Sequence, residues 1–316
     1  MVNGKEKNFL SAVLYVHDNR EEIEAFLPRL YHVLSEHFSQ FEIICVDDGS
    51  SDDSVTAIKK FASEVDGAVI SIIHMSLYQG LELSMNAGVD MAIGDYVFEF
   101  DSISSDYADS LIMQVYQEAL NGFDIVSAAP KSMKRRSSWL FYKIYNKNSR
   151  SAYPLRSETF RILSRRAINR VHSISRTIPY RKALYANCGL KLNSIFYESD
   201  RSRSGNAPLN RQINEKRRDL AADTFILFTD VAYKISLTLS GILLLLTVFS
   251  AVYTCVIFFG HHQPVAGWTT TMLLLSGGFF GVFLLITIVI KYLSVLVDLV
   301  FKRQKYLIES IEKLTK

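Results

Sequence analysis

Two short apolar runs in this chain each end at acidic residues, and acids in that position can hold a cation or a polar ligand. Residues 41–46 lead directly into Asp47 and Asp48, and residues 96–100 lead into Asp101. Both runs are short and rich in strand-forming side chains, which predicts buried strands that end in loops. Ligands of open α/β sheets bind outside the carboxyl ends of the strands. The sequence therefore predicts a polar site where these two strands end.

The elements around these runs alternate between strand-like and helix-like segments. Expected strands are residues 9–16, 41–46, 68–74, 96–100 and 125–129, and expected helices are residues 21–38, 55–65, 81–92 and 107–121. This alternation predicts an α/β fold with a mostly parallel sheet and helices on both faces. The alternation of strand-like and helix-like segments is no longer regular past Ala129. The phosphate-binding glycine patterns of dinucleotide enzymes and of P-loop proteins are absent from the sequence. The acids are therefore expected to bind a nucleotide diphosphate through Mg²⁺ or Mn²⁺, which prefer oxygen ligands.

Two uncharged apolar segments near the end of the chain predict membrane helices. Residues 235–259 are long enough to cross a bilayer of about 30 Å, and residues 272–290 form a second such run. The segment between them, residues 260–271, has no Lys or Arg, whereas both outer flanks are basic. The positive-inside rule then places both termini and the domain before the spans in the cytosol, in a multi-pass protein of the inner (cytoplasmic) membrane. Buried helices of a soluble protein are the alternative.

These patterns predict four parts along the chain. Residues 1–208 form a cytosolic α/β domain, residues 209–234 an amphipathic juxtamembrane segment, residues 235–300 two transmembrane helices, and residues 301–316 a cytosolic tail. The three cysteines lie far apart, which argues against a disulfide framework or a zinc site and fits a reducing cytosol. We expect membrane lipid as a partner and a homo-oligomer as the assembled state.

The stretch from Lys131 to Arg170 is strongly basic, and Glu158 is its only acid. Aromatic residues are interleaved with its cations, a pattern that nucleic-acid binding would explain. The two predicted membrane segments instead favour an anionic lipid headgroup or a lipid phosphate. A solvated basic face accounts for part of the charge. We expect no nucleic-acid partner.

Three motifs, taken in order, resemble those of family-2 glycosyltransferases of the GT-A fold. Residues 46–52 match the nucleotide motif, residues 79–96 match the helix and turn before the metal-binding strand, and residues 160–165 are similar to the acceptor-side Phe-Arg motif. With the paired membrane helices, the chain resembles more narrowly the polyprenyl-phosphate glycosyltransferases. That group includes dolichol-phosphate mannose synthase and bacterial undecaprenyl-phosphate sugar transferases.

The resemblance implies inverting transfer of a sugar from a nucleotide diphosphate sugar to a polyprenyl phosphate at the cytosolic membrane face. It implies nucleotide-binding roles for Asp18, Asp47, Asp48 and Gly49. It implies catalytic roles for Asp101 and Asp106, and a Mg²⁺ or Mn²⁺ ion held by Asp101, Ser105 and Asp106. The acceptor phosphate is expected at Arg136, Arg161, Arg201 and Arg203.

The chain departs from the family at its metal motif. The family's Asp-x-Asp becomes Asp101-Ser102-Ile103, so the second carboxylate is missing. Two alternatives therefore stay open beside the lipid-phosphate transferase. One is a membrane-anchored glycosyltransferase that extends a lipid-linked glycan. The other is a pseudo-transferase scaffold, which the missing carboxylate favours.

Overall fold

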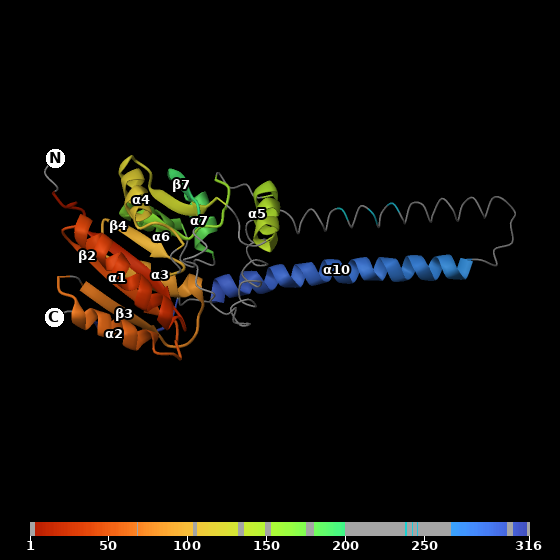
Figure 1. The fold of residues 1–316 in the computed structure, drawn as a ribbon. Helices are drawn as coiled ribbons and strands as arrows, with labels where there is room; N and C mark the ends of the chain where they lie inside the picture. The colour runs from red at the N-terminus through yellow and green to blue at the C-terminus, as the bar shows by residue number, and fades with distance from the viewer. Residues whose placement is uncertain are drawn as a thin grey trace. The chain divides into compact units, whose positions relative to one another are not determined.

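The computed structural model describes residues 4–67, 69–103, 106–131, 136–148, 153–174, 180–199, 267–301 and 306–314, and the single positions 238, 242 and 245. The chain divides into two compact units, Met1–Ala221 together with Arg303–Lys316, and Ala222–Lys302. The first unit holds the sheet and its covering helices (Figure 1). It therefore contains residues from both ends of the chain.

One sheet of the first unit is built from strands that lie far apart in the sequence. Its strands are β1 (Leu10–Val16), β2 (Phe41–Asp47), β3 (Val69–Met75), β4 (Tyr96–Phe100), β5 (Ile125–Pro130), β6 (Phe160–Ser164), β7 (Leu192–Tyr197) and β8 (Ile308–Lys313). Their order across the sheet is β7-β5-β6-β4-β1-β2-β3-β8. β1 to β4 are mutually parallel, as are β5 and β7, whereas β6 and β8 run antiparallel to their neighbours. The predicted mostly parallel α/β fold is confirmed.

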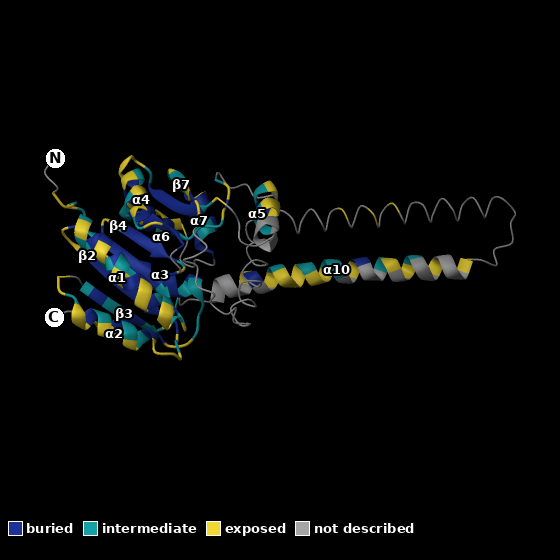
Figure 2. Cartoon of the chain, in the orientation of Figure 1, coloured by how far each residue is buried: buried dark blue, intermediate teal, exposed yellow. Residues whose placement is uncertain are grey.

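Helices cover both faces of this sheet. They are α1 (Arg20–His37), α2 (Ser54–Glu64), α3 (Leu81–Met91), α4 (Ser110–Leu120), α6 (Arg165–Ile174) and α7 (Arg181–Asn187), and a further helix, α5 (Arg136–Asn148), follows β5 in the sequence. Apolar side chains of α1, α2 and α4 share one core with Leu14 of β1, and those of α3, α6 and α7 share a second core with Val13. Successive strand residues point to opposite faces, so each strand serves both cores. Figure 2 shows the central strands almost wholly buried.

The sequence located the first half of this fold to within a few residues. The five strands and four helices expected between residues 9 and 129 correspond to β1 to β5 and α1 to α4. The strands β6, β7 and β8 were not expected. Residues 308–313, predicted to lie in a tail, pair with β3 as the strand at the edge of the sheet.

The second unit contains α10, which runs from Gly267 to Phe301 and includes the second expected membrane span. Over the residues that the structure describes, no helix meets the combined requirement of length and apolar character for crossing a bilayer. The first expected span lies outside the described residues except for positions 238, 242 and 245, and the juxtamembrane segment 209–234 lies wholly outside them. The membrane topology remains a prediction.

Candidate functional site

Asp48, just after β2, holds the loop that precedes α3. Its Oδ1 accepts the backbone N–H of Gln79 at 2.7 Å, and its Oδ2 accepts the N–H of Gly80 at 2.8 Å. The hydroxyl of Tyr15 donates to the same Oδ2 at 2.9 Å. Burial and the neighbouring Asp48 charge raise the pKa of Tyr15, so this hydroxyl keeps its proton. The fully buried Asp48 therefore fixes the position of the 79–80 backbone.

Asp47 and Gly49 shape the turn on either side of Asp48. Asp47 Oδ1 accepts the N–H of Ser50 at 3.0 Å, and its Oδ2 lies 3.3 Å from Nδ1 of His74. Gly49 has φ +68°, and a β-carbon there would lie 3.4 Å from the backbone nitrogen of Tyr78. The left-handed conformation and this close approach explain why the turn carries a glycine.

Asp18 links the loop after β1 to the loop after β2. Its Oδ1 accepts the N–H of Ser51 at 2.6 Å and the N–H of Asp52 at 3.3 Å. Next to it, the rings of His17 and Tyr78 stack with centroids 4.5 Å apart. The structure thus brings Asp18 and the 47–49 turn together at the carboxyl ends of β1 and β2. The sequence predicts a nucleotide site at this place.

Asp101, directly after β4, faces two arginines. Its Oδ2 accepts Nη2 of Arg161 at 2.5 Å, and its Oδ1 accepts Nη2 of Arg181 at 2.6 Å. Nζ of Lys182 lies 3.9 Å from Oδ2. Burial alone would raise the pKa of Asp101, but the charges of Arg161, Arg181 and Lys182 hold that pKa well below its usual range. Asp101 is therefore ionised at neutral pH with both oxygens engaged.

The two arginines belong to a buried ion network that joins separate elements. Arg161 of β6 contacts Glu99 of β4, and its Nε donates to Glu158 at 3.0 Å. Arg181 donates to Glu82 of α3 from its backbone N–H at 2.9 Å and from its Nε at 3.0 Å. Its Nη1 lies 2.8 Å from Oε1 of Glu99. Arg161 and Arg181 are 1% and 0% exposed, so this network holds them inside the protein.

The other residues expected at the metal lie differently. Asp106 is buried, and its Oδ1 accepts the hydroxyl of Tyr197 on β7 at 2.9 Å. Ser105 lies outside the described residues. In the described part of the chain, no three His, Cys, Asp or Glu side chains form a group that could hold a metal ion. Asp101 and Asp106 are thus both tied to protein partners.

Of the arginines expected at the acceptor phosphate, only Arg161 has a described side chain, and it lies in the ion network. Arg136 begins α5, but its side chain is outside the described ones, as are Arg201 and Arg203 altogether. The acceptor assignments of these residues remain predictions.

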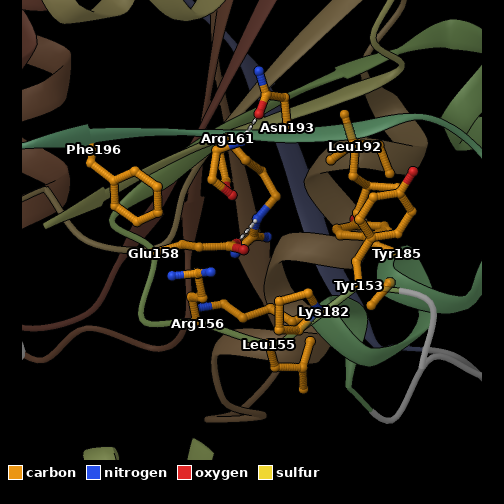
Figure 3. A pocket seen from close by; sticks show the side chains of 15 residues that line it. Tyr153, Leu155, Arg156, Glu158, Arg161, Lys182, Tyr185, Leu192, Asn193 and Phe196 are labelled. Carbon is orange, nitrogen blue, oxygen red and sulfur yellow. Dashed lines mark hydrogen bonds and ion pairs between the residues drawn. The ribbon is translucent and has the colours of Figure 1, made fainter. Parts of the chain in front are cut away.

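A pocket of about 270 Å³ opens beside the ion network, lined by residues of β5, β7 and α7 and by residues 153–158. Figure 3 shows Arg156, Glu158 and Lys182 among the side chains that line it. The guanidinium carbon of Arg156 lies 5.1 Å from the centre of the Phe196 ring. Through Lys182, which also approaches Asp101, the pocket adjoins the carboxyl end of β4.

A polar row crosses the sheet and reaches this pocket. The strand register places Arg161 opposite Glu99 on one side and opposite Ser127 on the other. Ser127 in turn lies opposite Ser194 of β7, with their hydroxyl oxygens 2.9 Å apart. Directly opposite residues share a face of the sheet. The row therefore leads from the ion network to two hydroxyls that line the pocket.

Sequence reasoning missed Arg156, Arg181 and Lys182, the cations that line the pocket or pair with Asp101. None of them lies in a motif that the sequence analysis used. The one available signal for Arg156 was its place in the basic stretch from Lys131 to Arg170. Arg181 and Lys182 follow that stretch, and only their place in the fold brings them next to Asp101.

Comparisons of the sequence with known proteins find relatives among glycosyltransferases. The model of the family described as glycosyl transferase family 2 matches residues 12–172. An uncharacterised glycosyltransferase of Synechocystis sp. is 25% identical over 244 residues, which cover 75% of each chain. An undecaprenyl-phosphate 4-deoxy-4-formamido-L-arabinose transferase of Proteus mirabilis is 30% identical over 132 residues, 42% of this chain and 39% of that protein. The match to the Proteus protein thus covers well under half of its length.

A similar solved structure is that of a mannosyltransferase from Pyrobaculum calidifontis in complex with GDP-Man and Mn²⁺. It is 14% identical, with a TM-score of 0.45, and the match covers 95% of this chain and 89% of that one.

Proposed function

The chain belongs to glycosyl transferase family 2, and from this premise we propose that it moves a sugar from a nucleotide diphosphate sugar to a polyprenyl phosphate at the cytosolic face of a membrane. The donor nucleotide would bind at the edge formed by Asp18 and the 47–49 turn. The acceptor phosphate would bind in the adjoining pocket. The name of the Proteus mirabilis relative, an undecaprenyl-phosphate transferase, supports this class of acceptor.

The observation that carries the proposal is a cationic pocket next to the strand end that bears Asp101. Arg156 and Lys182 line the pocket, as do Ser127 and Ser194, whose hydroxyl oxygens lie 2.9 Å apart. A guanidinium fork and an ammonium group both suit phosphate oxygens. An anionic acceptor in this pocket would lie beside the strand edge where the donor is expected.

The reaction needs little from a catalytic base. The second pKa of a phosphate monoester is about 6, so the acceptor oxygen is already largely ionised at neutral pH. That oxygen forms a bond to C1 of the sugar while the bond from C1 to the diphosphate oxygen breaks. The diphosphate leaves with the electron pair, and its charge grows as it does so. Lys182 and Arg156 would bind the anionic acceptor and hold its oxygen in line for attack on C1, a positioning contribution to the rate.

The described carboxylates do not fit a divalent cation as they stand. Both oxygens of Asp101 accept guanidinium groups, and Asp106 is tied to Tyr197. The expected Mg²⁺ or Mn²⁺ stays a prediction, to be tested by titrating each ion against the purified protein with and without nucleotide.

The return of the chain to the sheet supports the proposed topology. Because β8 pairs with β3, the residues that follow α10 lie on the same side of any membrane as β1 to β7. A segment that begins and ends on one side crosses a bilayer an even number of times, in agreement with two predicted spans. Within α10, large apolar side chains such as Val289 and Ile290 are 64% and 59% exposed. Apolar exposure of this kind is expected where lipid covers a helix.

The test is to identify the lipid product. Membranes that contain the protein are incubated with a panel of nucleotide sugars and a short polyprenyl phosphate, and the lipids are weighed by mass spectrometry. We expect one sugar to be added to the lipid phosphate. The Lys182→Ala variant should lose most of this product, whereas Lys191→Ala, which changes an exposed lysine outside the pocket, should keep it. A panel without any glycosylated lipid phosphate would contradict the proposal.

One observation favours a second candidate, the pseudo-transferase scaffold. The buried arginine pair neutralises the carboxylate on which a metal-dependent transferase would depend. A scaffold would bind a nucleotide without turnover. Nucleotide binding together with a complete absence of sugar transfer across the donor panel would favour the scaffold over the transferase.

A further inference from the structure

β8, the last described strand of the chain, is held at the proposed nucleotide site by side-chain contacts as well as by its pairing with β3. β8 pairs antiparallel to β3, with Ser310 opposite His74 and Ile308 opposite Met75. The N–H of Leu314 also donates to the carbonyl of Ile70 at 2.7 Å. This pairing alone would protect an edge strand. The contacts made by the side chains reach further, to the two residues of the nucleotide motif.

The first set of contacts runs from Leu307 to Asp48 through Gln79. The backbone N–H of Leu307 donates to Oε1 of Gln79 at 2.9 Å, and Nε2 of Gln79 donates to the Leu307 carbonyl at 2.6 Å. The backbone N–H of Gln79 donates to Asp48 at 2.7 Å. One residue thus binds the returning chain with its side chain and the nucleotide motif with its backbone.

The second set runs from Glu312 to Asp47 through His74. Oε2 of Glu312 lies 2.7 Å from Nζ of Lys59 and 3.5 Å from Nε2 of His74. Nδ1 of the same His74 ring lies 3.3 Å from Oδ2 of Asp47. The imidazole is therefore held between a carboxylate of the returning chain and a carboxylate of the nucleotide motif.

Beside these two sets, the hydroxyl of Tyr306 donates to Oδ2 of Asp90 at 2.8 Å. Asp90 lies on α3, the helix whose preceding loop Asp48 fixes. The residues that follow α10 thus contact two elements near the nucleotide motif: they pair with β3 and hydrogen-bond to α3.

We propose that Leu307 and Glu312 of the returning chain position the donor nucleotide, acting through Gln79 and His74. The inference rests on the proposed nucleotide site at Asp47 to Gly49 and adds the C-terminal strand to it. Without the returning chain, the Gln79 side chain and one side of the His74 ring lose their partners. The loop amides and carboxylates that shape the nucleotide site then lose their fixed positions, and donor binding weakens.

The test compares variants on the two contact routes with a matched variant on the same strand. Gln79→Ala removes the side-chain bonds to Leu307 and keeps the backbone N–H that Asp48 accepts. Glu312→Ala breaks the second route. Glu309→Ala is the control, because Glu309 is an exposed residue of the same strand and takes part in neither of the two contact routes described above. The measurement is the dissociation constant of UDP, GDP, dTDP and CDP for the full-length protein in detergent.

We expect Gln79→Ala and Glu312→Ala each to weaken the best nucleotide by about fivefold to tenfold, the ratio that one or two lost hydrogen bonds give. Glu309→Ala should match the wild type. In transfer assays, the KM for the donor should rise while kcat and the KM for polyprenyl phosphate stay constant, a pattern that general loss of fold would not produce.

A truncated chain that lacks β8, supplied with β8 as a separate peptide, gives an independent measurement of the effect on nucleotide binding. A chain that ends at Lys305 should bind nucleotide weakly, and a synthetic peptide of residues 306–316 should restore binding by pairing with β3. Equal nucleotide affinity in the wild type and in both side-chain variants would overturn the positioning role, whatever the truncated chain does. If none of the four nucleotides binds the wild type, the proposed donor site itself fails, and this outcome is distinct from the first.

Discussion

Arg181 is a buried cation surrounded by three carboxylates. It contacts Glu82, Glu99 and Asp101 and is fully buried. Removing one partner of a buried ion pair leaves an uncompensated charge and costs about 3–5 kcal/mol. We expect Arg181→Ala to lower the free energy of unfolding by that amount, measured by denaturant titration in detergent.

The matched control for this prediction is Arg166, which pairs with Asp124 at 2.6 Å but is 70% exposed. Solvent screens an exposed pair, so its loss should change stability little. If Arg166→Ala destabilised the protein as much as Arg181→Ala, burial would not be what makes the Asp101 network strong.

The charge state of Asp101 gives a pH-dependent prediction. Its pKa is held below its usual range in the folded protein, so the unfolded chain binds the proton more readily. The stabilisation is therefore fully present above about pH 5 and declines as the pH falls below the ordinary Asp value of about 3.9. Asp101→Asn should be less stable than the wild type at pH 7, and this gap should narrow towards pH 3. Thermal unfolding midpoints measured from pH 3 to pH 7 provide the check, and a gap that stays constant would contradict the assigned ion pairs.

At the scale of elements, α3 lies unusually close to the sheet at one glycine. A β-carbon on Gly88 would lie 2.3 Å from Cγ1 of Val13 and 2.8 Å from Cγ2 of Val46. Such overpacking costs about 1–3 kcal/mol. Alanine gains about 1 kcal/mol over glycine in helix propensity. We expect Gly88→Ala to lower the thermal unfolding midpoint and to weaken nucleotide binding, because α3 follows the loop that Asp48 holds.

A double variant isolates the cause. Val13→Ala removes the methyl group with which the new β-carbon would clash. The loss of stability in the double variant, Gly88→Ala with Val13→Ala, should therefore be smaller than the sum of the losses in the two single variants. Strict additivity would place the origin of the effect elsewhere than in this contact.

The elements that the sequence predicted are those whose signals are local. β1 to β4 are short apolar runs bounded by polar turns, and α1 to α4 carry apolar residues at helical spacing. β6 lies between β4 and β5 in space although it follows both in sequence, and β8 joins the sheet from beyond α10. No local pattern reports such pairings, because they depend on distant strands leaving an edge free.

In the candidate site, too, the sequence predicted only the features that depend on local signals. Asp47, Asp48 and Gly49 were placed correctly at the sheet edge because a strand end and a turn are local features. The partners of Asp101 were not foreseen, since Arg181 reaches it from a helix 80 residues further along the chain. Arg161 is expected at the acceptor phosphate, and that role remains a prediction; its pairing with Glu99, Asp101 and Glu158 was not expected.

At the scale of the whole molecule, the position of β8 makes the topology testable at both ends. We expect cysteines placed at Lys5 and at Glu309 to be shielded from an impermeant thiol reagent in intact cells, and a cysteine at Pro264 to react. The native Cys45 and Cys188 are buried, and burial raises the pKa of Cys45 to about 12, so both should stay unreactive. Labelling of Lys5→Cys and Glu309→Cys with protection of Pro264→Cys would reverse the assigned orientation.

The pairing of β8 with β3 also determines when the sheet can be completed during synthesis. β3 ends at Met75 and leaves the ribosome with its outer edge bare, whereas its partner strand begins only at Ile308. At translation rates of about 5–20 residues per second, that edge waits on the order of 10 s or longer. A bare strand edge is a template for pairing with any other extended chain, including a second nascent copy. Newly made molecules therefore depend on chaperones, or on the speed of their own completion, to keep that edge for β8.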